Sequence, residues 1–62
     1  MQADRLLRLR DVAHLVGLSK ATIYRRIRAG QFPPPVSAGG HSVRWKASTI
    51  EAWMAGLTQR VI

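Results

Sequence analysis

The side chains best suited to chemistry in this sequence are cations gathered between residues 20 and 28. That segment carries one tyrosine and no acid among its basic residues, which are Lys20, Arg25, Arg26 and Arg28. The arginine side chain presents a planar fork of N–H donors that matches the paired oxygens of carboxylates and phosphates. The segment is therefore suited to binding an anion through hydrogen bonds and charge.

Groups that support catalysis or hold a metal are sparse. The chain has three acidic residues, two histidines and no cysteine, which excludes a disulfide framework and a thiolate metal site. None of the serines has a histidine and an acid at the spacing of a nucleophile motif. We therefore predict that the protein is not an enzyme and that it needs neither a metal nor a cofactor.

Length and charge narrow the function further. A chain of 62 residues forms one domain, close to the smallest size that can bury its own core. Ten Lys/Arg against three Asp/Glu give a formal charge of +7, spread along the chain. We therefore expect a polyanionic partner, of which nucleic acid is the commonest.

The sequence predicts neither a signal peptide nor a membrane span. The basic N-terminal region does not resemble a signal peptide. The uncharged stretch 29–43 holds three prolines and three glycines, which are unsuited to a membrane helix. We expect a cytoplasmic protein with no membrane partner.

Residues 11–29 have the pattern of two short helices joined by a glycine turn. Val12, Ala13 and Val16 share one face of a helix that begins near Asp11, whose charge suits a helix start. Gly17 can end this helix because glycine adopts a positive φ at little cost.

Ser19 is a typical N-cap residue for a second helix, from Lys20 to about Ala29. Ile23 and Ile27 lie four residues apart and predict the buried face of this helix. The residues predicted on the opposite face are Ala21, Tyr24, Arg25 and Arg28.

The remaining elements are a hairpin, a third helix and a short N-terminal segment. Val36–Ser37 and Val43–Trp45 predict two strands around residues 38–42. Ser48 and Glu51 match a capping box that would start the third helix. Its predicted apolar face is formed by Ile50, Trp53, Met54 and Leu57. Residues 6–9 are compatible with either a strand or a packed arm.

This order of elements predicts a mainly α winged helix-turn-helix with a small β-hairpin, over residues 6–58. Residues 1–5 and 59–62 are predicted to be flexible termini.

The major groove of DNA accepts one α-helix, and arginine pairs well with guanine edges and phosphates. We therefore predict that helix 20–29 binds double-stranded DNA in that groove. Residues 37–44 form the wing, which is predicted to contact flanking DNA. The predicted DNA-binding residues are Ser19, Lys20, Ala21, Thr22, Tyr24, Arg25, Arg26 and Arg28 in the helix and Gly40, His41, Ser42 and Arg44 in the wing.

A longer motif resembles a known family. Its parts are Leu9-x-x-Val12-Ala13-x-x-Val16-Gly17-Leu18-Ser19-x-x-Thr22-Ile23-Tyr24-Arg25, Gly30-Gln31-Phe32-Pro33, Val43-Arg44-Trp45 and Glu51-Ala52-Trp53. Over residues 6–57 the chain is similar to the AlpA family of small phage and prophage regulators, which are related to excisionases and to the winged helix of MerR proteins. The resemblance implies a bacterial DNA-binding regulator of a mobile element that controls integrase transcription or acts as an excisionase (a recombination directionality factor). By the family's motif, Ser19, Thr22, Tyr24 and Arg25 would face DNA.

The resemblance leaves several functions open. One small module buries little DNA surface, so we expect self-association on tandem or paired sites, with an integrase as a further candidate partner. A first alternative is a protein-interaction module that binds an integrase or a repressor. A second alternative is a nucleic-acid binder without sequence preference, driven by charge.

Overall fold

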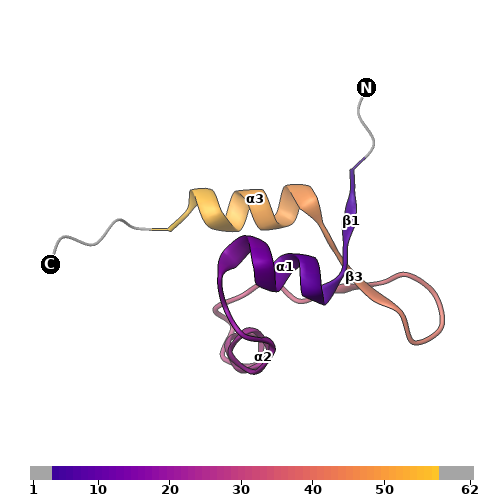
Figure 1. Cartoon of the computed structure of the whole chain (residues 1–62), viewed down its shortest axis with the longest axis horizontal. Coiled ribbons are helices and arrows are strands. Elements are labelled where there is room, and N and C mark those ends of the chain that lie inside the picture. The colour runs from indigo at the N-terminus through magenta and orange to yellow at the C-terminus, as the bar shows by residue number, and fades with distance from the viewer. Residues whose placement is uncertain (1–3, 58–62) are drawn as a thin grey trace, which may run out of the picture.

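The computed structural model describes residues 4–57, over which three helices and three short strands follow one another. Their order is β1 (Leu6–Leu7), α1 (Leu9–Val16), α2 (Lys20–Arg28), β2 (Val36–Ser37), β3 (Val43–Lys46) and α3 (Ala47–Ala55). Figure 1 shows α1 between α3 and α2, with the hairpin that ends in β3 extending away from the helices. This arrangement confirms the predicted class, a mainly α winged helix-turn-helix with a small sheet. Among the helices described, none is long and apolar enough to cross a membrane.

The sheet joins the N-terminal segment to the hairpin. Its strand order is β1-β3-β2, with both pairings antiparallel. Leu6 pairs with Lys46 and Leu7 pairs with Trp45, so the strand is the correct one of the two interpretations left open for this segment. Because side chains alternate across a strand, Leu7 and Trp45 point into the core, and both are buried.

One residue from almost every element contributes to the core. Its buried members are Leu7, Val12, Ile23, Phe32, Trp45 and Ile50. Ile23 and Val12 are fully buried, which joins α2 to α1 as the helical periodicity predicted. Half-buried residues that pack around this core include Ala13, Val16, Leu18, Ile27 and Trp53.

The turn between α1 and α2 follows the sequence closely. Gly17 has a φ of 70°, and its N–H donates to the Ala13 carbonyl at 2.9 Å. The Ser19 hydroxyl caps α2 by accepting a hydrogen bond from the Thr22 N–H at 3.2 Å. The start of α1 lies at Leu9, two residues earlier than predicted, because the Asp11 carboxylate accepts the Arg8 N–H at 3.1 Å and lies inside the first turn.

The predicted capping box of α3 is wrong, because the helix begins at Ala47 and its cap comes from the other end of the sequence. The Asp4 carboxylate accepts the Ser48 N–H at 3.1 Å and the Ser48 hydroxyl at 2.5 Å. The Ala47 N–H donates to the Arg5 carbonyl at 2.8 Å. Asp4 and Arg5 are therefore held against the domain, whereas the sequence placed them in a flexible terminus. The predicted flexible residues 1–3 and 59–62, and residue 58, lie outside the described residues.

The C-terminal end of α3 also differs from the prediction. The helix ends at Ala55, with Gly56 as its C-cap residue. Leu57 therefore lies beyond the helix and is 57% exposed, so it does not continue the apolar face. Trp53 is half-buried and packs against Phe32, with 4.7 Å between the ring centroids.

Asp4 gives a test of this cap. Its pKa lies below the ordinary 3.8, first because the Ser48 hydroxyl donates to the carboxylate and then because the Ser48 N–H and nearby Lys46 favour the charged form. A carboxyl whose pKa is lower in the folded state stabilises that state above its unfolded pKa, and the contribution is lost as the pH falls through the folded pKa. We expect Asp4→Asn to lower the melting temperature at pH 7, and the difference from the unmodified protein to shrink below pH 3.8.

Circular dichroism melts over a pH series measure this effect. Glu51→Gln is the matched control, because it removes an exposed carboxylate from α3 itself and tests the capping box that the structure does not form. A larger decrease of the melting temperature for Glu51→Gln than for Asp4→Asn would contradict the cap that Asp4 forms.

Candidate nucleic-acid interface

The basic helix α2 is buried along one face only. Ile23 has no exposed surface, and Ile27, Thr22 and Arg26 are half-buried at the edges of that face. The exposed residues are Lys20, Ala21, Tyr24, Arg25 and Arg28. The outward face predicted from helical spacing is therefore the face that the structure exposes. The helix α2 itself lies on the side of α1 opposite α3 (Figure 1).

Three polar side chains are linked at the beginning of α2. The Ser19 and Thr22 hydroxyl oxygens are 2.9 Å apart, and Arg25 Nη2 donates to Thr22 Oγ1 at 3.3 Å. This link holds the Arg25 guanidinium over the first turn of the helix and uses only part of its donor capacity. The remaining N–H donors are free to pair with an acceptor outside the protein, close to the positive end of the helix dipole.

The wing residues gather in one exposed loop. Its backbone is closed by hydrogen bonds from the Ala38 N–H to the Ser42 carbonyl at 2.9 Å and from the Ser42 N–H to the Gly39 carbonyl at 3.0 Å. Gly40 has a φ of 57°, a conformation that side-chain-bearing residues seldom adopt. Gly40, His41 and Ser42 are exposed. Arg44, at the base of the loop, is half-buried, with Nη1 donating to the Val43 carbonyl at 2.8 Å.

Two tryptophans fix the segment that connects α2 to the hairpin. The Trp45 indole N–H donates to the Pro33 carbonyl at 2.9 Å, and the Trp53 indole N–H donates to the Gln31 carbonyl at 3.1 Å. The sequence predicted Trp45 in a strand and Trp53 on the apolar face of the third helix. It did not predict these bonds, because backbone carbonyl partners leave no signal in residue type. The bonds set the position of the hairpin relative to α2.

Charge is distributed unevenly over the chain. The acids are at positions 4, 11 and 51, so the stretch 12–50, which contains α2 and the wing, has none. The cations of that stretch are Lys20, Arg25, Arg26, Arg28, Arg44 and Lys46. The Asp4 and Asp11 carboxylates accept hydrogen bonds at the starts of α3 and α1, away from α2. An anion that approaches α2 or the wing meets uncompensated positive charge.

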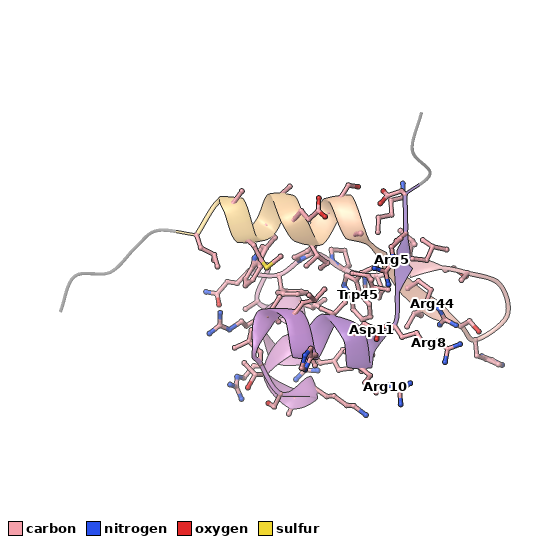
Figure 2. The ribbon with its side chains drawn as sticks, turned by 45° about the horizontal axis from the view of Figure 1, so that its top comes forward. Arg5, Arg8, Arg10, Asp11, Arg44 and Trp45 are labelled. Atoms are coloured by element: carbon pink, nitrogen blue, oxygen red, sulfur yellow. The ribbon has the colours of Figure 1, made fainter. Side chains whose placement is uncertain are left out.

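Arg8 and Arg10 were not among the predicted site residues. Both are exposed and lie at the beginning of α1, and Figure 2 shows them on the same side of the molecule as Arg44. The residue types gave no signal for Arg8, because Leu6-Leu7-Arg8 does not alternate between apolar and polar residues. The outward position of Arg8 follows only once this segment is known to be a strand.

Comparison with known proteins agrees with the sequence motifs. The sequence profile of the family described as "Prophage CP4-57 regulatory protein (AlpA)" matches residues 5–58. The chain is 57% identical over 53 residues to "Uncharacterized protein ORF88" of Enterobacteria phage P4, a match that covers 86% of this chain and 60% of that protein. The chain thus spans less than two thirds of the relative's length. No solved structure matches significantly. The chain belongs to the AlpA family of prophage regulatory proteins.

Proposed function

We propose that this protein binds double-stranded DNA with sequence preference on behalf of a phage or other mobile element, in the bacterial cytoplasm. In this proposal α2 enters the major groove and the wing, residues 37–44, contacts the flanking DNA. The observation that carries the proposal is the exposed basic face of α2, set against a face whose central Ile23 is fully buried. A helix fixed in this way can enter a groove without losing its packing.

The residues of α2 divide into two roles by position. Arg25 and Arg28 lie on the exposed face and are suited to hydrogen-bond base edges, with Tyr24 beside them. Ser19, Lys20 and Thr22 lie at the helix start, where hydroxyls, an ammonium group and free backbone N–H groups suit a phosphate. Arg26 is half-buried, so a phosphate at the edge of the groove suits it better than a base. Ala21 leaves room for a close approach of DNA.

The wing residues complete the proposed surface. Gly40, His41 and Ser42 lie at the tip of an exposed loop, and Arg44 lies at its base. A narrow tip of this kind suits the backbone or the minor groove beside the site that α2 occupies.

The biological role that we propose is regulation of the mobile element, as an excisionase, as a transcriptional regulator, or as both. One winged helix covers little DNA, about 600–1,000 Å² for a single small module, so useful specificity requires several copies on tandem or paired sites. An excisionase role would add contact with an integrase.

Footprinting tests this proposal directly. The DNA to use is the upstream region of the element's own genes together with its attachment sites. We expect discrete protected segments, repeated where copies bind side by side, and a log–log salt slope of about −4 to −5 for about five phosphate contacts. Uniform weak protection of all DNA, or capture of an integrase by a protein that leaves DNA unprotected, would contradict the proposal.

A further inference from the structure

We propose that Arg8, together with Arg44, binds a backbone phosphate of the DNA between the segments occupied by α2 and the wing. This inference rests on the proposed function and adds to it a residue from α1 and the first strand. It assigns a ligand to a pair of cations that the fold brings together from residues far apart in the sequence.

The strand register places the two arginines opposite each other. β1 and β3 pair antiparallel, with Leu7 opposite Trp45 at the end of β1. Continued by one position, this register sets Arg8 opposite Arg44. The backbone of Arg8 is still extended, with φ −81° and ψ 161°, before α1 begins. Residues opposite each other in an antiparallel pair have Cβ atoms about 4.5–5.5 Å apart and share a face of the sheet. Figure 2 shows the Arg8 and Arg44 side chains extending from the strands on the same side.

This face of the sheet is the one that points away from the core. Leu7 and Trp45 are buried on the other face, whereas Arg8 is exposed and Arg44 is half-buried. Lys46, also exposed, lies two positions from Arg44 and therefore on this same outer face. Three cations thus share one small surface.

Like charges directly opposite each other destabilise a sheet. The Asp11 carboxylate accepts the Arg8 backbone N–H and the Asp4 carboxylate accepts hydrogen bonds from Ser48. Within residues 4–57, neither carboxylate is hydrogen-bonded to the Arg8 or Arg44 guanidinium. The Arg44 guanidinium uses one donor on the Val43 carbonyl and retains others. An anion between the two guanidinium groups would remove the repulsion and satisfy their free donors.

The DNA backbone is the anion that fits this position. Arg44 is continuous with the wing, and the N-terminal end of α1, where Arg8 lies, is between the wing and α2 in Figure 1. A duplex that contacts both of these elements carries a line of phosphates past the sheet. The pair then fixes how the domain is oriented on DNA without reading sequence.

The test compares salt dependence with stability. The probe is a random-sequence duplex, so that the result does not depend on knowing the target site. We expect Arg8→Gln to reduce the magnitude of the log–log salt slope by about 0.9, and to weaken binding about threefold or more at 0.1 M salt. Because repulsion from Arg44 is removed, the melting temperature of Arg8→Gln without DNA should equal or exceed that of the unmodified protein at low salt.

Arg5→Gln is the matched control. It removes the same charge from the same segment, but Arg5 lies on the other face of β1, where it lines a groove beside α1 with Leu7. We expect its salt slope to change by less than half as much as that of Arg8→Gln. Equal salt slopes for Arg8→Gln and the unmodified protein would overturn the inference. An equal reduction of the salt slope in Arg8→Gln and Arg5→Gln would overturn it as well. A different result would contradict the proposed function, namely an unmodified protein that binds all duplexes with the same affinity.

Discussion

Ile23→Ala is expected to lower the free energy of unfolding by about 2–5 kcal/mol, because it removes most of a fully buried side chain. Ile23 has no exposed surface and belongs to the core cluster that unites the helices with the sheet. Replacing it with alanine leaves a cavity that a close-packed interior cannot fully collapse. A domain of 62 residues has little stability in reserve, so much of the protein should be unfolded at room temperature.

Urea denaturation followed by circular dichroism measures this loss. Leu15→Ala is the matched control, because Leu15 is a large aliphatic residue on α1 that is 53% exposed. This substitution should change the free energy of unfolding by no more than about 0.5 kcal/mol. An Ile23→Ala protein that unfolds at the same urea concentration as the unmodified one would show that the buried face of α2 has been assigned to the wrong residues.

Arg25→Ala is expected to weaken binding to the footprinted site by about 1–3 kcal/mol, a factor of about 5 to 150, and to relax the sequence preference. Arg25 lies on the exposed face of α2, and its guanidinium is held by Thr22 Oγ1 at 3.3 Å. A pre-oriented fork loses little entropy when it pairs with a base, so its removal should affect specific binding more than general attraction. Titration of the footprinted site and of a random duplex separates the two effects.

Arg25→Lys gives the sharper comparison. Lysine keeps the charge but loses the planar fork, so the salt slope should stay near that of the unmodified protein while the preference for the site falls. If both variants keep full affinity and an unchanged footprint, Arg25 does not contact a base.

Much of α2 and its turn could be predicted from the sequence because the signals there are local. Gly17 and Ser19 act through their own backbone or over one helical turn, and the Ile23–Ile27 spacing depends only on helical geometry. The exposed face followed from the same geometry. Its contact with DNA stays a prediction.

The cap of α3 could not be predicted because its partner is distant. Ser48 and Glu51 fit a capping box by type and spacing. In the structure, however, the Ser48 N–H and hydroxyl donate to the carboxylate of Asp4, which lies 44 residues away in the sequence. A contact of this separation exists only after β1 has paired with β3. The same pairing brings Arg8 opposite Arg44, which explains why Arg8 was missed as a site residue.

The end of α3 shows a second limit. Residue 57 fits the apolar spacing of the helix, yet the helix stops at Ala55 and leaves Leu57 exposed. Periodicity predicts which face a residue would occupy in a helix, but it does not predict where the helix ends. Gly56 is the C-cap residue in the structure, as suits a residue that weakens a helix interior.

The central claim is that the exposed face of α2 distinguishes one duplex from another. A competition titration tests this most directly, with a labelled duplex that carries the footprinted site and unlabelled competitors that carry either the same site or a shuffled sequence of equal length. At physiological salt we predict that the site competes at concentrations about a hundredfold or more below those of the shuffled duplex. Competition by both duplexes at the same concentration would contradict the claim, and would leave a basic domain that binds DNA by charge alone.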